Sequence, residues 1–511
     1  MNKNKTIVHI AYEVAPFYKK GGLGDVVSAL PKYLSQKYDN VVVSIYYKGL
    51  MNCLENYSTH DFIVELQGIE YKFKYYYLIR NNIEYYFLNM EDEFVYSNNV
   101  FDNFNGDNPY KNLSSIVIFL YFGKAALTLI QSRINNLMLL MCHDWHAAGV
   151  FAYPSIIKKI VGKSNLLVST SILIHNYEHQ GNIYDDIFPF LEDEPHILLK
   201  DLYSKFGSAS LLGLAIEHAD YILTVSENYA QELKKGIAPH ENLKFILNTR
   251  KKIIGLQNGV DYNIWHPNRS IYLSKKYNID SSENKKYYKQ LIFQKCGFDQ
   301  KKLDEVPLIL FMGRLTRQKG INLFFDGNNE NQDYAIEFYK KLFDLGIKLF
   351  VYGNPSGGIN GKIHTSLSFL QEKFKDSFYY DPYYNEETAH NLLAAADITL
   401  LPSLFEPCGL VQLYSMAFGA IPIVTPVGGL KDSVKCFYDE RQKPTGFYLK
   451  SFSRNGLYES IKKTVEIYKN FPEIWNEIKK NAMEENFAWE KNVQNYFNFI
   501  DSVQVGNYNV V

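Results

Sequence analysis

The chain has little excess charge of either sign. Its 511 residues include 54 lysines and arginines and 55 aspartates and glutamates, which gives a net charge of −1. Because affinity for nucleic acid and for anionic membranes depends on clustered positive charge, neither is an expected partner. Long apolar runs are also missing, and none approaches the roughly 20 residues that span a bilayer.

Cysteine is scarce, with five residues in the whole chain. Their number is odd and no two have CxxC spacing, which excludes a disulfide framework and favours a reducing compartment. The N-terminus, MNKNKTIVHIAYEV, lacks the apolar core of a signal peptide and the Arg- and Ser-rich composition of a transit leader. The sequence therefore predicts a cytoplasmic protein, with a plastid location only if a leader precedes it.

What the chain does contain is a globular composition and a repeated strand–helix pattern. Hydrophobic residues make up 46% and charged residues 21% of the chain. Many short runs are apolar throughout, as strands buried on both faces of a parallel sheet must be. The predicted strands form two series, at 6–14, 40–47, 137–144, 166–175 and 221–226, and at 307–315, 347–353, 398–403 and 421–429. Two such series predict two doubly wound α/β domains, joined near residues 255–265.

Three segments depart from this alternation. Residues 71–90 have strand character on both sides of an Asn-Asn pair and predict an antiparallel hairpin. Residues 266–305 are polar and only weakly periodic, and 327–333 read as a polar surface loop.

The first motif with chemical potential is the glycine cluster after the first strand. Lys19 precedes Gly21, Gly22 and Gly24, and a helix follows. Glycines let backbone N–H groups approach a ligand closely, and the helix directs its positive dipole end to the same place, so a phosphate is the natural guest. Neither GxGxxG nor GxxxxGK[ST] is present, and a plain strand–helix turn explains the spacing equally well.

Polar clusters follow two further strands of the first series. Residues 143–146 read His-Asp-Trp-His, and residues 175–181 read HNYEHQG. Because the carboxyl ends of parallel strands border the ligand crevice, the cluster at 143–146, with Asp144, is well placed to bind sugar hydroxyls. The cluster that begins at His175 follows a neighbouring strand and is expected to face the same pocket, but a lone histidine is more often structural. A metal site is not expected, since the HxxH has no further ligands at metal spacing. The competing interpretation is a set of solvated strand ends.

The second series offers a basic turn and an acidic turn. Arg314 and Lys319 follow its first strand, five residues apart, and both could bind one diphosphate. An isolated RxxxxK is more often a solvated turn. Glu406 lies in PSLFEPCGL between a strand and a helix, with Pro407 expected in the first turn of that helix. A carboxylate there can bind sugar hydroxyls, and Gly428 and Gly429 open another helix suited to a phosphate.

Together these segments resemble the bacterial and plant type glycogen/starch synthases. The matching blocks, in the order of the family, are KKGGLGDVVSALP, HDWHAAG, HNYEHQG, TVSENYAQEL, GLQNGVDYNIWHP, GRLTRQKG, PSLFEPCGLVQLYSMAFGAIPIV, GGLKDSV, TGF and NFAWEKNVQNYF. They cover residues 6 to about 498. The resemblance implies the GT-B fold: α/β, with two Rossmann-like doubly wound domains facing a deep cleft. It assigns residues 1–257 to an N-terminal domain on the glucan side and 258–487 to a nucleotide-sugar domain. Residues 488–511 are implied to form a helix that returns to the N-terminal domain.

The resemblance also implies roles for individual residues. The reaction centre is expected to contain Asp144, His175, Arg314, Lys319 and Glu406. The nucleotide sugar is expected to contact Lys19, Gly21, Gly22, Asn258, Arg314, Lys319, Cys408, Gly409, Leu410, Gly428 and Gly429. No metal and no cofactor are expected.

The expected reaction is transfer of glucose, with retention of configuration, from ADP-glucose to the non-reducing end of an α-1,4-glucan. Departures from the family pattern at Lys20, Thr425 and Val427 flank the donor, and they leave UDP-glucose open as the donor. Two rival functions also stay open: a retaining transferase with a small acceptor, and a catalytically silent glucan-binding homologue. The sequence does not indicate oligomeric state, primer preference or regulation.

Overall fold

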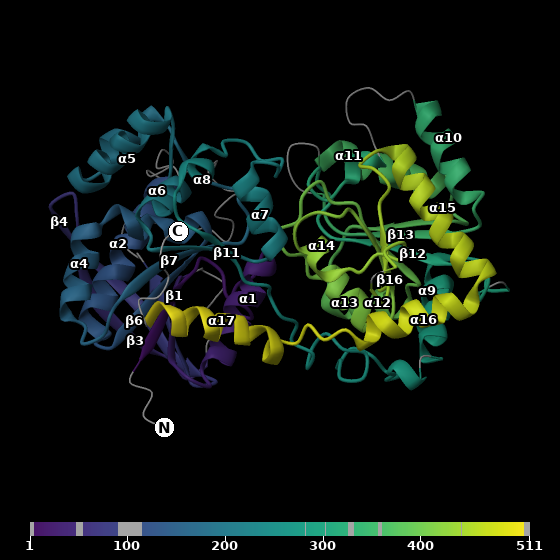
Figure 1. The fold of residues 1–511 in the computed structure, drawn as a ribbon, viewed down its shortest axis with the longest axis horizontal. Coiled ribbons are helices and arrows are strands. Elements are labelled where there is room, and N and C mark those ends of the chain that lie inside the picture. The colour runs from purple at the N-terminus through teal and green to yellow at the C-terminus, as the bar shows by residue number, and fades with distance from the viewer. Residues whose placement is uncertain are drawn as a thin grey trace. The chain divides into compact units, whose positions relative to one another are not determined.

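The computed structural model describes residues 5–46, 55–89, 115–281, 283–301, 303–324, 332–355, 360–440 and 442–504. The chain divides into two compact units (Figure 1). The first unit is Met1–Gly259 with Trp489–Val511, and the second is Val260–Ala488. The sequence placed these boundaries at 257/258 and 487/488.

A nine-stranded sheet forms the centre of the first unit, in the order β11-β10-β7-β6-β1-β2-β5-β4-β3. All neighbours from β11 to β5 pair in parallel, as the apolar strand runs predicted. The strand bounds are β1 Thr6–Ile10, β2 Asp39–Ile45, β3 Ser58–Leu66, β4 Ile69–Arg80, β5 Ile83–Asn89, β6 Leu137–His143, β7 Ser169–Ile174, β10 Tyr221–Thr224 and β11 Ile253–Gly255. A separate antiparallel pair joins β8 Asn182–Ile183 to β9 Ala209–Ser210.

The predicted hairpin is confirmed by β4 and β5, which pair antiparallel from Arg80↔Ile83 outward. Asn81 and Asn82 form its turn with φ of 54° and 60°, the left-handed values that a two-residue hairpin requires and that asparagine tolerates. Residue 90, the last of the predicted segment, lies outside the described residues. The antiparallel strand β3, which pairs with β4 at the edge, was not predicted.

The helices of the first unit are α1 Gly22–Leu34, α2 Ser115–Arg133, α3 Asp144–Ala147, α4 Pro154–Lys163, α5 Asp193–Phe206, α6 Leu211–His218, α7 Glu227–Lys235, α8 Lys244–Asn248 and α17 Trp489–Gln504, with the 3-10 turns η2 Ala148–Ala152 and η3 Asp185–Phe190. The expectation that no apolar run approaches membrane-spanning length is wrong for α2. Its segment Ile116–Arg133 has a mean hydropathy of 1.3 over 18 residues, but 67% of that window is buried inside the structure. Within the described chain it is the one helix with this property, and it packs as a core helix: Gly123 lies against the backbone of Gly149 in η2.

The C-terminal helix α17 packs against α1 and the turn that follows it. Trp489 stacks on Tyr33 with ring centroids 6.2 Å apart, and Asp501 accepts a 2.7 Å hydrogen bond from the Tyr38 hydroxyl. The side chain of Asn492 donates to the Asn258 carbonyl oxygen at 2.9 Å. These contacts are why residues far apart in the chain belong to one unit.

The second unit is built on a six-stranded, entirely parallel sheet in the order β14-β13-β12-β15-β16-β17. The strand bounds are β12 Leu308–Met312, β13 Lys348–Tyr352, β14 Phe378–Asp381, β15 Ile398–Leu401, β16 Ile421–Val424 and β17 Phe447–Tyr448. The helices are α9 Asn284–Cys296, α10 Gln332–Phe343, α11 Asn360–Lys373, α12 Glu386–Ala395, α13 Val411–Ala417, α14 Gly428–Ser433, α15 Arg454–Asn470 and α16 Pro472–Glu484, with the turns η4 Ile279–Ser281 and η5 Ile321–Leu323.

Two expectations change in this unit. The weakly periodic stretch 266–305 contains the 13-residue helix α9. Of the polar loop expected at 327–333, residues 327–331 lie outside the described part, and Gln332 already begins α10.

Each sheet has a point at which the strand order reverses, between β1 and β6 in the first unit and between β12 and β15 in the second. Loops at the carboxyl ends of the strands on either side of such a point form the ligand crevice of doubly wound folds. The loops after β1, β6, β12 and β15 carry four of the selected clusters, and the other two follow the neighbouring strands β7 and β16.

Candidate active site

In the second unit, the loops after β12 and β15 pack backbone against backbone. Gly320 has a φ of +79°, and a Cβ on it would lie 2.0 Å from the Pro402 carbonyl oxygen. The Leu404 N–H donates to the Gln318 carbonyl oxygen at 2.8 Å. Only glycine permits this approach, and the approach brings the side chains of Lys319 and Glu406 together.

Lys319 and Glu406 form an ion pair with 2.5 Å between Nζ and Oε2. The same carboxylate oxygen accepts a 3.1 Å hydrogen bond from the Ser403 hydroxyl. The Glu406 side chain is 6% exposed and that of Lys319 is 24% exposed, so the carboxylate is buried while the ammonium group reaches the surface. A buried carboxylate held by a cation and a hydroxyl is a preorganised charged centre.

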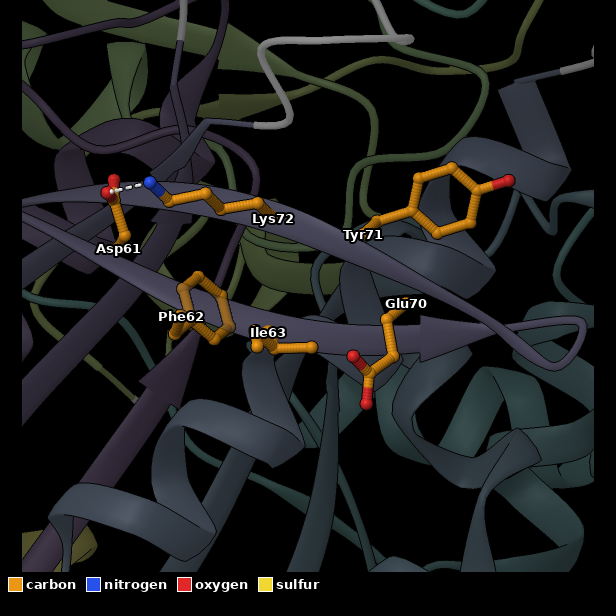
Figure 2. A pocket seen from close by; sticks show the side chains of 6 residues that line it. All are labelled: Asp61, Phe62, Ile63, Glu70, Tyr71 and Lys72. Carbon is orange, nitrogen blue, oxygen red and sulfur yellow. Dashed lines mark ion pairs between the residues drawn. The ribbon is translucent and has the colours of Figure 1, made fainter.

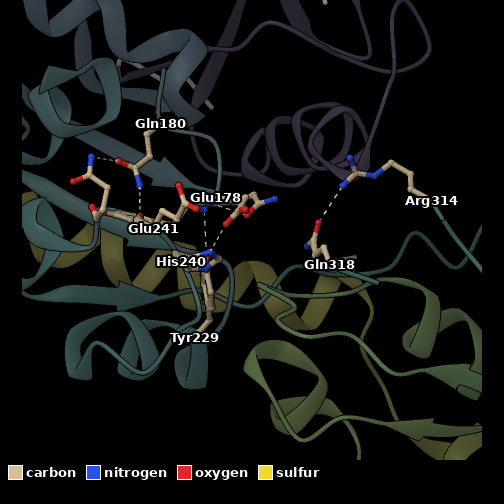
Figure 3. A network of polar contacts seen from close by, with 10 residues as sticks. Glu178, Gln180, Tyr229, His240, Glu241, Arg314 and Gln318 are labelled. Carbon is tan, nitrogen blue, oxygen red and sulfur yellow. Dashed lines mark hydrogen bonds and ion pairs between the residues drawn. The ribbon is translucent and has the colours of Figure 1, made fainter. Parts of the chain in front are cut away.

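Arg314 is exposed, and its guanidinium donates only a long 3.4 Å hydrogen bond to Gln318 (Figure 3). Among the described residues it pairs with no carboxylate. Arg314 and Lys319 therefore share one loop but differ in state: the arginine is available to an anion, whereas the lysine is already paired.

The loops after β15 and β16 also pack closely. Gly428 has a φ of +45°, and a Cβ on it would lie 1.9 Å from the Glu406 carbonyl oxygen. The Gly429 N–H donates to that same oxygen at 3.0 Å, and a Cβ on Gly429 would meet the Cys408 carbonyl oxygen at 2.2 Å. The two glycines thus hold residues 406–408 in place at the start of α14.

Residues 407–410 differ from one expectation. Pro407 was expected in the first turn of the following helix, but α13 begins at Val411, so that expectation is wrong. Gly409 adopts a φ of +69°, and Leu410 is the residue that caps α13. The chain between Glu406 and α13 is an extended turn rather than helix because Gly409 takes a left-handed conformation there.

In the first unit, Asp144 and His175 meet at the ends of β6 and β7. One carboxylate oxygen of Asp144, Oδ1, accepts hydrogen bonds from the backbone N–H groups of His175 at 2.6 Å and Asn176 at 3.2 Å. Asp144 has a φ of +58°, a left-handed conformation that is uncommon outside glycine and is found at strained functional positions. Burial raises the pKa of Asp144 to about 7, with a smaller contribution from the charge of Glu13.

His175, which is half-buried, ends a row of hydrogen-bonded histidines that the sequence analysis did not predict, and the other two are buried. His143 hydrogen-bonds to His175 at 3.0 Å on one side and to His9 at 3.1 Å on the other. His9 in turn contacts the Asn40 side chain at 3.2 Å. Both ring nitrogens of His143 are used in this row, so neither is free for a metal ion. Among the described residues no cluster of three or more His, Cys, Asp or Glu is arranged to hold one.

The glycine loop of the first unit is held by a residue that the sequence analysis overlooked, Glu13. One oxygen of this buried carboxylate accepts hydrogen bonds from the backbone N–H groups of Lys20 at 2.5 Å and Gly21 at 3.1 Å. Burial raises the pKa of Glu13. The Lys19 ammonium group pairs with Asp25 at 2.7 Å. Gly22 begins α1 and Gly21 caps it in an extended conformation, so the predicted strand–loop–helix is present.

Asn258 lies at the end of the first unit, 4% exposed, and its Oδ1 has no hydrogen-bond partner among the described residues. The first unit therefore contains Lys19, Gly21, Gly22, Asp144, His175 and Asn258, and the second contains Arg314, Lys319, Glu406, Cys408, Gly409, Leu410, Gly428 and Gly429.

A polar network beside His175 joins Glu178 to His240 at 2.9 Å and His240 to the Tyr229 hydroxyl at 2.7 Å (Figure 3).

A pocket elsewhere in the first unit lies on the β3–β4 hairpin (Figure 2). It is lined by Asp61, Phe62, Ile63, Glu70, Tyr71 and Lys72. Asp61 and Lys72 form an ion pair at 2.6 Å across it. None of the predicted site residues lines this pocket, so it is not the candidate active site.

Comparison with known proteins identifies the family. A family model described as a starch synthase catalytic domain matches residues 6–248, and one described as glycosyl transferases group 1 matches residues 294–484. The glycogen synthase of Finegoldia magna is 28% identical over 97% of this chain and 99% of its own length. The glycogen synthase of Lachnospira eligens is 29% identical over 98% of this chain and 100% of its own. The chain belongs to the glycogen/starch synthase family.

Solved structures support the same assignment. The catalytic domain of starch synthase IV from Arabidopsis thaliana, bound to ADP and acarbose, superposes on this glycogen/starch synthase with a TM-score of 0.80 and 26% identity, covering 98% of this chain and 99% of that one. Sucrose-phosphate synthase from Thermosynechococcus elongatus has a TM-score of 0.58 at 13% identity and shows the fold alone. The protein is thus a glycosyltransferase of the GT-B type, as the sequence motifs implied. The roles of its individual site residues stay predictions.

Proposed function

We propose that this glycogen/starch synthase transfers glucose from ADP-glucose to the non-reducing end of an α-1,4-glucan with retention of configuration. The observation that carries the proposal is the Lys319–Glu406–Ser403 centre beside the open Arg314 at the strand ends of the second unit. A nucleotide-sugar donor leaves a diphosphate, and the charge that develops on it needs preorganised cations and N–H groups.

The second unit supplies such groups. We assign Arg314 and Lys319 to the diphosphate, where the planar guanidinium can bind two oxygens and the ammonium group acts as a point charge. Glu406 is assigned to the glucosyl unit, whose ring gains positive charge as the diphosphate departs. Gly428 and Gly429 keep Glu406 in position. The proposal needs no metal and no cofactor.

The first unit supplies two polar atoms that have no partner among the described residues. Asp144 uses Oδ1 for two backbone N–H groups, and His175 uses Nε2 for His143. The described residues provide no partner for Asp144 Oδ2 or His175 Nδ1, and we assign these two atoms to sugar hydroxyls. Because the pKa of Asp144 is about 7, its carboxyl group can either donate or accept near neutral pH.

ADP is preferred over UDP as the donor nucleotide because the starch synthase IV domain, whose structure covers almost the whole of this chain, is bound to ADP. UDP-glucose is the alternative donor, and a silent glucan-binding protein is the alternative function. A cytoplasmic location stays a prediction.

The test is a transfer assay with purified protein, glycogen, and radiolabelled ADP-glucose or UDP-glucose. We expect label from ADP-glucose in the precipitated glucan and its release by an exo-acting hydrolase specific for non-reducing α-1,4 ends. The Glu406→Gln variant is the matched control, since it keeps the shape of the side chain and removes its charge. More label from UDP-glucose would overturn the donor assignment, and no label from either donor with intact glycogen binding would establish the silent alternative.

A further inference from the structure

A row of hydrogen-bonded side chains crosses the sheet of the first unit to reach His175. It starts at Asn40 in β2, continues through His9 in β1 and His143 at the end of β6, and ends at His175 after β7. These strands are neighbours in the order β7-β6-β1-β2, which is why residues so far apart in sequence form one row. The three contacts measure 3.2, 3.1 and 3.0 Å, and His9 and His143 are 0% exposed.

Asn40 determines which ring nitrogen of His9 carries the proton, and so which atom donates in each hydrogen bond of the row. Its Nδ2 donates a 3.0 Å hydrogen bond to the Tyr38 carbonyl oxygen, so its Oδ1 faces His9. The flipped amide would set Oδ1 against the Tyr38 carbonyl oxygen, two acceptors with no proton between them. Since Oδ1 can only accept, His9 must carry its proton on Nε2 and donate it to Asn40.

The same donor and acceptor argument applies to His143 and then to His175, as long as each ring is neutral. A neutral His9 protonated on Nε2 has a lone pair on Nδ1, so His143 must donate from its Nε2. His143 then accepts on Nδ1, so His175 must donate from its Nε2. Burial lowers the pKa of His9 to about 4 and that of His175 to about 3, and it lowers the pKa of His143 well below its usual range. The rings are therefore neutral at physiological pH.

We propose that Asn40, His9 and His143 are positioning residues that hold His175 as its Nε2–H tautomer, so that Nδ1 always presents a lone pair to the substrate. The inference rests on the proposed role of His175 in binding a sugar hydroxyl. Asn40 and His9 do not touch the substrate in this scheme. They act through His143, by fixing which nitrogen of His175 carries the proton and how the ring is oriented.

Substitution of one residue of the row should allow His175 to adopt the other tautomer. In His9→Leu, the His143 Nε2–H loses its acceptor, and His143 can instead carry its proton on Nδ1 and donate to His175. His175 would then be protonated on Nδ1 and lose the lone pair offered to substrate. In His9→Gln, the side-chain oxygen can still accept from His143 while the amide nitrogen donates to Asn40. Asn40→Leu repeats the test at the far end of the row, because it removes the acceptor that keeps the proton on His9 Nε2.

The test combines kinetics with nitrogen NMR of the full-length protein labelled in its histidine rings, with signals assigned by single substitutions. In the wild type we expect Nε2–H signals and unprotonated Nδ1 signals for His9, His143 and His175. We expect His9→Leu to show protonated Nδ1 at His175 and about a tenfold lower kcat, the size of one lost hydrogen bond. His9→Gln should restore both, and His60→Leu, at an exposed histidine of β3, should change neither.

The outcomes separate this inference from the proposed function. A wild type without transferase activity contradicts the function, while its ring spectrum still decides whether the tautomers are as proposed. An active His9→Leu with unchanged kcat and an unchanged His175 signal overturns the inference. If His9→Leu does not fold, Asn40→Leu replaces it. A wild-type His175 protonated on Nδ1 overturns the inference whatever the variants show.

Discussion

Replacing Lys319 with alanine should reduce activity and stability together, and the structure indicates how to separate the two effects. Lys319 Nζ lies 2.5 Å from Glu406 Oε2, and when the lysine is removed the carboxylate keeps, of its described side-chain partners, only the Ser403 hydroxyl. The variant therefore takes a cation from the proposed diphosphate site and also leaves a buried charge unpaired.

The size of the stability loss follows from the unequal burial of the pair. Fully exposed ion pairs contribute about 0–1 kcal/mol, and removing one partner of a buried pair costs about 3–5 kcal/mol. Because Glu406 is 6% exposed and Lys319 24%, Lys319→Ala falls between these limits, at about 1–3 kcal/mol. Glu406→Gln should cost less, since the lysine that it leaves unpaired can reach water. The double variant Lys319→Met/Glu406→Gln buries no unpaired charge and should regain most of the loss.

The activities of these variants should not follow the order of their stabilities. Loss of one preorganised charge stabiliser typically lowers turnover about 100- to 1,000-fold, so Lys319→Ala and the double variant should both be nearly inactive. The assay is transfer of labelled glucose to glycogen beside chemical denaturation of the same preparations. A double variant with substantial turnover, or a Lys319→Ala variant with wild-type turnover, would show that the lysine is a structural partner of Glu406 only.

Four further substitutions test other parts of the structure. Arg314→Ala should lower kcat/KM for the donor about 100-fold without changing the denaturation midpoint, because the guanidinium is exposed and unpaired with any carboxylate in the described chain. In the wild type, Asp144 binds its proton with a pKa raised from 3.8 to about 7, so its contribution to folding stability falls as pH rises from about 4 to 7. Asp144→Asn lacks this dependence and should gain stability relative to wild type between pH 5 and pH 7 in denaturant titrations. Gly428→Ala should cost at least about 2 kcal/mol and most of the activity, because its Cβ would lie 1.9 Å from the Glu406 carbonyl oxygen; calorimetry and the transfer assay check this. Trp489→Ala should destabilise the first unit by about 3–5 kcal/mol in denaturation followed by circular dichroism, since this 2% exposed side chain anchors α17.

Most of the fold could be predicted because short sequence segments determine most of its strands and turns. Apolar runs such as 137–144 and 307–315 have the length and composition of doubly buried strands, and both are strands in parallel sheets. The Asn81–Asn82 turn is equally local. Strand β3 was missed because it is an edge strand, exposed over most of its length, and so carries no strong apolar signal. Pro407 was wrongly expected in the first turn of α13 because the left-handed conformation of Gly409, which lies between the two, depends on what packs around it.

The candidate site could be predicted only as far as residue types at strand ends. That Arg314 and Lys319 follow one strand is visible in sequence, but their different states are not. The packing of Gly320 on Pro402 sets the distance from Lys319 to Glu406, and it joins residues 87 positions apart. The histidine row is another case: Asn40 and His9 lie in no selected motif, His143 was selected only as part of the strand-end cluster 143–146, and only the strand order makes the three residues neighbours.

Charge pairing decides which of the predicted phosphate ligands can act. In the glycine loop, Glu13 accepts hydrogen bonds from the backbone N–H groups of Lys20 and Gly21, and Asp25 forms an ion pair with Lys19. The loop with the strongest sequence signal for an anion thus already holds one, a carboxylate of the protein itself. An incoming phosphate there must displace that carboxylate or bind to groups that it leaves open. In the second unit, the exposed guanidinium of Arg314 faces no such competition from a described carboxylate, so a diphosphate should meet Arg314 first and gain contact with Lys319 only as Glu406 turns to the sugar.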